Sequence, residues 1–219
     1  MLRIVKRIVE VFGRPGRRAI PGGPGAGRTA PAAMAAAEQD RANRPAPWEP
    51  APGPQDLIVG PWGARFAGRQ FPCAIGRGGI RPAAAKREGD GATPAGRWRL
   101  TGAYYRADRM PRPLTELACK PIGPRLAWCE DPADPAYNRP VARAPGDGGD
   151  RMARGDGLYD LVAVTDHNSP PTPGAGSAIF LHAWRKPRHP TAGCIAFHPR
   201  DLEWILARWQ PGARVIVRS

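Results

Sequence analysis

The sequence predicts a mainly β domain with a short α component, in which a single helix follows the last cysteine. Two observations lead to this fold class. Short apolar runs bounded by Gly, Pro or Asp recur from residue 56 onward, which is typical of strands joined by turns. Only one segment of this region, close to the C-terminus, has the spacing of an amphipathic helix.

The predicted strands follow one another along the chain as short apolar or alternating runs. A turn around Ala67–Gly68 separates the first two, because glycine favours a change of chain direction. We expect the strands at Leu57–Val59, Phe71–Ile75, Arg97–Tyr105, Leu158–Val164, Ala178–His182 and Arg214–Arg218.

The predicted helix follows the last cysteine. Its apolar residues recur at i, i+3, i+4 and i+7, which places them on one face: Leu202, Ile205, Leu206 and Trp209. Pro199 or Asp201 would begin the helix, and Gly212 would end it.

A candidate nucleophilic site combines His182, at the end of a predicted strand, with Cys194. A thiol needs a nearby base or a lowered pKa before it can act as a nucleophile. Gly193 lets the backbone approach a substrate closely, so N–H groups around Gly193 and Cys194 would receive the oxyanion of an acyl-transfer step. The N-terminus of the following helix would favour a thiolate if it lies close to the sulfur.

Two motifs in the chain resemble those of the L,D-transpeptidases of the YkuD fold. The first is a His followed by a short loop and Ser/Thr-x-Gly-Cys, which is present as His182 and Thr191–Cys194. The second is similar to the Thr-Pro-x-Gly segment that precedes a strand in this family, and it is present as Thr93–Gly96. The resemblance covers roughly residues 56–219 and implies a catalytic domain with a β-sandwich or barrel fold.

The resemblance implies a peptidoglycan L,D-transpeptidase that needs no metal and no organic cofactor. Cys194, assisted by His182, would attack the carbonyl of the third residue of a tetrapeptide stem, while the backbone at Gly193 and Thr191 holds the oxyanion. The terminal D-Ala would leave, and the thioester would pass to an amine of a neighbouring stem as a 3→3 cross-link. Peptidoglycan stem peptides are therefore the expected partners, and the oligomeric state is open.

The chain departs from the family pattern in three places. Members often carry a polar residue where Ala192 stands and commonly an Arg where Ala196 stands. The loop between His182 and Thr191 is also shorter than in many members. These departures concern the contacts to the donor peptide rather than the chemistry of the Cys and His.

Polar side chains near the motif are candidates for substrate binding. Arg185 and Arg188, with Lys186 between them, lie in the loop before Thr191 and would replace the missing positive charge. Asn168 follows a predicted strand and is a candidate for contacting substrate or, like Asp166, for orienting an imidazole.

Two alternative functions stay open on the sequence. If water takes the place of the acceptor amine, the same site becomes an L,D-carboxypeptidase or a related thiol amidase on the same substrate. A non-catalytic protein that binds the cell wall or another anionic polymer would keep the fold without the reaction. Ala192 and Ala196 favour this last alternative, whereas the intact Cys194 and His182 oppose it.

The remaining His and Cys residues offer rival interpretations. His189 lies in a Pro-flanked loop and His198 opens the predicted helix, so both rank below His182 as the base. The four cysteines contain no CxxC pair, which argues against a metal site. Cys119 and Cys129 would close a small loop if they formed a disulfide, which the sequence does not decide.

Residues 1–50 are expected to form a disordered, basic tail rich in Pro, Gly and Ala. The substrate places the protein in the cell envelope, in the periplasm, yet this region has no clear signal peptide and no transmembrane run. A misplaced start, an unusual export route, a basic segment on a membrane surface and a tail without a targeting role are the alternatives.

The net charge of +14 favours anionic partners, and no nucleic-acid-binding motif accompanies it. Residues 109–156 are expected to form a long irregular region that either lines the cleft or only covers the edge of the barrel.

Overall fold

The computed structural model describes residues 51–219 except residue 145, so the tail expected at 1–50 lies outside the described residues. The first half contains β1 (Leu57–Gly60), β2 (Gly63–Phe66), β3 (Arg69–Phe71), β4 (Cys73–Ala74), β5 (Ile80–Pro82), the 3-10 helix η1 (Ala83–Ala85), β6 (Thr93–Trp98) and β7 (Leu100–Tyr105). The second half contains β8 (Cys119–Pro121), β9 (Leu126–Trp128), β10 (Pro140–Ala142), β11 (Asp150–Arg151), β12 (Leu161–Thr165), β13 (Phe180–Ala183), β14 (Ile195–Phe197), α2 (Pro199–Leu206) and β15 (Val215–Val217).

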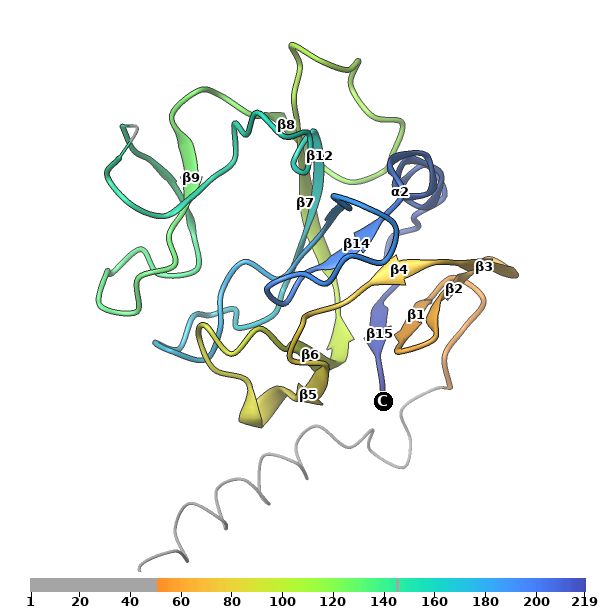
Figure 1. The fold of residues 1–219 in the computed structure, drawn as a ribbon. Coiled ribbons are helices and arrows are strands. Elements are labelled where there is room, and N and C mark those ends of the chain that lie inside the picture. Colours follow the sequence, from red (N-terminus) through yellow and green to blue (C-terminus); the bar gives the residue numbers. More distant parts are fainter. Residues whose placement is uncertain (1–50, 145) are drawn as a thin grey trace, which may run out of the picture.

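Two six-stranded sheets form the body of the domain (Figure 1). The first sheet has the order β3-β2-β1-β15-β6-β5, and the second has the order β4-β14-β13-β12-β7-β8. Both sheets mix parallel and antiparallel pairs, since β1 runs parallel to β15 and β13 runs parallel to β14. The mainly β fold with one helix after Cys194 is thereby confirmed within the described residues.

The main core lies between the two sheets and under α2. Alternate residues of the second sheet, such as Leu181, Ile195 and Phe197, meet residues of the first sheet there. The apolar face of α2 completes this core, because Leu202, Ile205 and Leu206 are fully buried. Each such side chain contributes roughly 1.5–3 kcal/mol when it leaves water. The predicted helix is confirmed, and Pro199 begins it with His198 as the N-cap. Its predicted end is wrong, because the helix stops at Leu206 rather than near Gly212 and Trp209 lies beyond it.

The second sheet is buried on its other face as well. A second apolar cluster there includes Val162, Phe180 and Cys194, together with Trp128 and Met152 from the region before β12. All five residues of β12 are consequently buried, which explains why its first four residues, Leu161–Val164, are all apolar rather than alternating.

The region expected to be irregular, residues 109–156, contains ordered structure. It holds β8, which joins the second sheet, and a separate small sheet with the order β10-β9-β11. In Figure 1 this small sheet lies to the side of β7 and β12. The expectation was wrong here because strands of two or three residues are too short to show a period in sequence.

Asn138 ties the small sheet to the rest of the domain. Its Oδ1 accepts hydrogen bonds from Trp128 Nε1 at 2.9 Å and from the backbone N–H of Ala178 at 3.1 Å. Its Nδ2 donates to the backbone oxygens of His167 and Asn168, each at 3.1 Å. The region that covers the second sheet is therefore fixed directly to the segment that leads into β13.

Several predicted strands have different limits in the structure. The expected strand Phe71–Ile75 is divided at Pro72, between β3 of the first sheet and β4 of the second. The expected strand Arg97–Tyr105 is divided at Arg99, where the chain leaves the first sheet and enters the second. Asp166 holds this crossing, since its Oδ1 accepts from Arg99 N at 2.8 Å and its N–H donates to Arg99 O at 3.0 Å. The strand expected at Leu158 begins only at Leu161, after a turn in which Asp160 N donates to Gly157 O at 3.2 Å.

Candidate active site

His182 and Cys194 reach the same place because of strand register. Leu181 lies opposite Ile195 and His182 opposite Ala196 in the parallel pair β13–β14, so Cys194 falls opposite Phe180. Side chains alternate along a strand, which puts Phe180 and His182 on one face. Neighbouring strands about 5 Å apart and a two-residue offset of about 7 Å separate the Cα atoms of Cys194 and His182 by roughly 8 Å.

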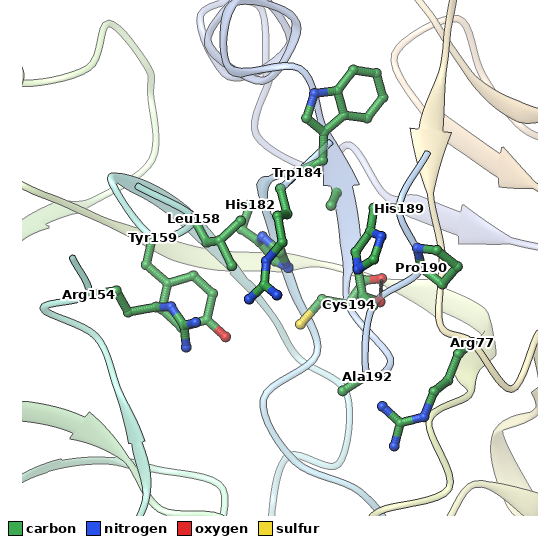
Figure 2. A pocket seen from close by; sticks show the side chains of 13 residues that line it. Arg77, Arg154, Leu158, Tyr159, His182, Trp184, His189, Pro190, Ala192 and Cys194 are labelled. Atoms are coloured by element: carbon green, nitrogen blue, oxygen red, sulfur yellow. Dashed lines mark hydrogen bonds between the residues drawn. The ribbon is translucent and has the colours of Figure 1, made fainter. Parts of the chain in front are cut away.

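A cavity of about 250 Å³ opens at these two residues (Figure 2). Beside His182 and Cys194, its lining residues are Arg77, Arg154, Leu158, Tyr159, Trp184, Arg185, His189, Pro190, Thr191, Ala192 and Ala196. In Figure 2 the Cys194 sulfur lies between Tyr159 on one side and Ala192 on the other. The buried face of the second sheet thus opens to solvent at the thiol.

The imidazole of His182 is held in one tautomer. Its Nδ1 lies 2.7 Å from the backbone oxygen of Ala183, which can only accept, so Nδ1 carries the proton and Nε2 is free to accept one. The ring of Tyr159 packs edge-on against it with centroids 5.3 Å apart. Burial lowers the pKa of His182 to about 4, so the free protein holds a neutral imidazole at pH 7.

The thiol of Cys194 is also neutral in the free protein. Its Sγ donates to the backbone oxygen of Ala178 at 2.9 Å and accepts from the N–H of Phe180 at 3.4 Å. Burial raises its pKa to about 12, although the Phe180 N–H favours the thiolate. The proton of the thiol therefore points to Ala178 rather than to His182 before substrate binds.

The helix dipole does not act on this thiol as expected. The helix α2 begins at Pro199, and the whole of β14 lies between it and Cys194. Dipole effects fall off within about one turn of a helix end. The strand that separates them is what the sequence pattern failed to resolve, because Ile195–Phe197 is only three residues long.

The turn that presents Cys194 joins the two sequence motifs. Thr191 Oγ1 donates to Cys194 O at 2.6 Å and accepts from Gly193 N at 3.1 Å. Thr93, from the Thr-Pro-x-Gly segment, is fully buried and donates through Oγ1 to Gly193 O at 2.7 Å. Gly193 has a φ of +149°, and an added Cβ would lie 3.0 Å from Ala92 O. The threonines and the glycine therefore fix the backbone on both sides of the sulfur.

This arrangement agrees with a comparison against protein families. A family model for the YkuD L,D-transpeptidase catalytic domain matches residues 67–217. The chain belongs to this family. No curated protein and no solved structure matches it. Membership confirms the resemblance and identifies a cysteine-dependent L,D-transpeptidase-type enzyme of peptidoglycan, whose substrate implies an extracytoplasmic location. Within the described residues, no helix has both the length and the apolar character that crossing a bilayer requires.

The backbone donors of this YkuD domain are not all available for an oxyanion. The N–H of Gly193 donates to Thr191 Oγ1, and the N–H of Thr191 donates to Ile75 O at 3.0 Å. Cys194 N–H has no hydrogen-bond acceptor among the described residues. Of the backbone groups expected to form the oxyanion site, the N–H of Cys194 is therefore the one available to a substrate oxyanion.

The expected substrate-binding residues of the YkuD domain occupy different places. Arg185 lines the cavity, whereas Arg188 is exposed and does not. Asn168 is used within its own loop, since its Nδ2 donates to Thr172 O at 3.0 Å and to Gly176 O at 2.9 Å.

The two rival histidines of the YkuD domain also separate. His189 lines the cavity and thus shares it with His182. The Nδ1 of His198 accepts from Arg200 N at 3.3 Å, which caps the helix. The four cysteines are free thiols, Cys119 and Cys129 included. Residues 51–219, apart from 145, contain no group of three His, Cys, Asp or Glu arranged to hold a metal ion.

Several cavity residues were not identified from the sequence. The hydroxyl of Tyr159 donates to Asp150 Oδ2 at 2.5 Å, and burial raises its pKa well above the ordinary value. Arg154 lies over the Tyr159 ring, 5.0 Å from its centroid, and pairs with Asp156 at 2.7 Å. Arg77 comes from the loop after β4. None of these residues forms a sequence motif with Cys194, because only the folded topology brings them to it.

Proposed function

We propose that this YkuD domain is a peptidoglycan L,D-transpeptidase that forms 3→3 cross-links through a thioester on Cys194. The proposal rests on one observation above all. A buried thiol and a buried histidine whose Nε2 is unprotonated line the same cavity, and the backbone N–H of Cys194 is free beside them. These groups are a nucleophile, a base and an oxyanion donor, which acyl transfer requires together.

The first step transfers the acyl group of the donor stem to sulfur. On substrate binding the thiol rotates from Ala178 O towards His182 Nε2, which takes the proton as sulfur attacks the carbonyl of the third residue. The carbonyl oxygen becomes an oxyanion held by Cys194 N–H. Protonated His182 then gives its proton to the departing nitrogen, and D-Ala leaves while the C–S bond remains as a thioester.

The second step transfers the acyl group from sulfur to the acceptor. An uncharged amine of a neighbouring stem attacks the thioester carbonyl, and His182 accepts a proton from its nitrogen. The C–S bond breaks, and the proton held by His182 returns to the sulfur. Burial favours the neutral form of the imidazole in the resting enzyme, so its Nε2 can accept a proton at the start of each step, although the low pKa also makes it a weak base.

The catalytic domain in this proposal spans residues 56–219. Asp56 supports the boundary, since its carboxylate accepts from Arg214 N at 2.9 Å and from Arg214 Nη2 at 3.0 Å. The same contacts and the parallel pair β1–β15 close the first sheet with residues from both ends of the range. The proposed location is the periplasm, where the peptidoglycan lies.

The experiment that tests this function is mass analysis after incubation of the full chain with a disaccharide-tetrapeptide. A product without D-Ala together with a cross-linked dimer supports the transpeptidase, whereas the shortened product alone supports an L,D-carboxypeptidase. Both products must vanish in Cys194→Ala and His182→Ala. Cys119→Ala is the matched control, because this free thiol is half-buried and lies outside the cavity.

A folded wild-type chain that gives neither product nor acyl adduct would contradict the proposal. That result would favour a non-catalytic domain that binds the cell wall.

A further inference from the structure

The cavity at Cys194 is lined by three arginines that differ in their surroundings. Arg154 pairs with Asp156 at 2.7 Å and with Asp150 at 3.3 Å, so its charge is compensated. Arg185 lies 3.8 Å from the same Asp156. The side chain of Arg77, in contrast, has neither an ion-pair nor a hydrogen-bond partner within the described part of the chain.

Arg77 is attached to the same turn as the nucleophile. Its N–H donates to Thr191 O at 2.9 Å, and Thr191 N–H donates to Ile75 O at 3.0 Å. Thr191 in turn bonds to the backbone oxygen of Cys194 through Oγ1. The position of Arg77 is therefore fixed relative to the sulfur through the backbone, even though its side chain is exposed.

A glycine makes room for the Arg77 side chain. A Cβ added to Gly91 would lie 2.9 Å from Arg77 Cγ and 3.1 Å from its Nε. The stem of Arg77 thus lies flat against the backbone of Gly91, whose φ of +67° also favours glycine. This contact limits the conformations of the side chain, and a preorganised side chain loses less entropy when a ligand binds.

Figure 2 shows Arg77 and Arg154 on opposite sides of Cys194, with Ala192 between the sulfur and Arg77. The small side chain of Ala192 leaves the space between them open. An unpaired guanidinium that borders a cavity presents two parallel N–H donors, which match a carboxylate. The opposite side of the sulfur has its positive charge already neutralised by Asp150 and Asp156.

We propose that Arg77 binds a carboxylate of the donor stem next to the bond that Cys194 attacks, an inference that rests on the proposed function. A tetrapeptide stem offers two carboxylates near that bond. One is the C-terminal carboxylate of D-Ala, and the other is on the side chain of a diacid third residue. Arg77 thereby supplies the positive charge that Ala196 lacks, from an element more than one hundred residues earlier in the chain.

The test measures binding separately from turnover. Titration calorimetry of the full chain carrying Cys194→Ala gives the Kd of the tetrapeptide stem without reaction. Adding Arg77→Gln is expected to raise this Kd about tenfold, because a charge-assisted bidentate contact is lost at a site open to solvent. Arg77→Lys is expected to recover part of the affinity. Arg81→Gln is the control, since Arg81 is exposed on β5 and outside the cavity.

Two amidated stems identify the carboxylate. One carries an amide at the terminal D-Ala, and the other carries it on the side chain of the third residue. If Arg77 binds one of these carboxylates, the stem amidated at that carboxylate should have the same Kd for the Cys194→Ala chain with and without Arg77→Gln. The other stem should keep the tenfold difference.

Three results would overturn the inference. They are no binding of the stem by the parent chain, an equal Kd in Arg77→Gln, and a tenfold difference that persists with both amidated stems. Turnover by the wild-type chain is a separate measurement. It tests the proposed function, which can stand even where Arg77 proves to have no part in binding.

Discussion

The resting state of the thiol leads to a quantitative prediction about its reactivity. Burial raises the pKa of Cys194 to about 12, so about one molecule in ten thousand is a thiolate at pH 8. An exposed thiol with a pKa of about 8.5 is about one quarter ionised at that pH. A thiolate of higher pKa is also more nucleophilic, because the logarithm of its rate constant rises by about 0.4–0.5 for each pH unit of pKa. The difference of about 3.5 between the two pKa values makes the Cys194 thiolate roughly 40-fold more reactive than the model thiolate. Alkylation of Cys194 should therefore be about 60-fold slower than that of a model thiol.

The assay is the pH dependence of alkylation by a small neutral reagent, with each cysteine quantified by peptide mass analysis. The rate at Cys194 should rise tenfold per pH unit from pH 6 to 10 without a plateau, and His182→Gln should not change it. Cys73 is a matched control, because it is similarly buried and its pKa is also raised to about 12. A plateau at Cys194 between pH 5 and 8 that His182→Gln removes would refute this reasoning, since it would reveal a preformed thiolate–imidazolium pair.

Three further predictions concern the framework around the site. Asn138→Ala removes four hydrogen bonds and should lower the free energy of unfolding by about 2–4 kcal/mol in urea titrations, and a loss below about 1 kcal/mol would contradict the role given to it. Burial lowers the pKa of His167 to about 4, so between pH 6.5 and 4 the unfolded chain binds a proton that the folded chain does not. Stability should fall as pH decreases through this window, by up to about 3 kcal/mol from this residue, and His167→Gln should flatten the slope of unfolding free energy against pH. Gly193→Ala forces a Cβ to within 3.0 Å of Ala92 O and should abolish product formation, whereas Gly89→Ala, also at positive φ but in open space, should leave the rate unchanged and cost about 1 kcal/mol in thermal unfolding.

The sequence was sufficient for the parts of the site that depend on local pattern. The apolar run before His182 and the Gly-Cys pair are short-range signals, and strand alternation places both side chains on one face of the sheet. The helical spacing after Cys194 was equally local, so the presence and the start of the helix were predicted correctly, whereas its end at Leu206 was not. In each case the residues that carry the signal lie within about two helical turns or one strand of each other.

The sequence was not sufficient where sheet topology decides. The alternation of Arg97–Tyr105 continues across Arg99, so nothing in it marks the change from one sheet to the other. Arg77 and Tyr159 reach the cavity from segments far apart in the sequence, and neither belongs to a motif with Cys194. The raised pKa of the Cys194 thiol was not predicted for a related reason. It depends on burial beneath segments that lie far away in the sequence.

The central place of β15 in the first sheet bears on how the domain is made by the ribosome. This strand is the last element of the described chain, yet it lies between β1 and β6, and the strands β2, β3 and β5 extend the sheet outward from these two. Until β15 has emerged, β1 and β6 both present an unpaired edge, and such edges invite pairing with other chains. The sheet can therefore close only after synthesis of the domain is complete. A nascent chain stalled before residue 215 would expose two unpaired strand edges, so we expect it to aggregate more readily than a stalled chain whose strands pair locally.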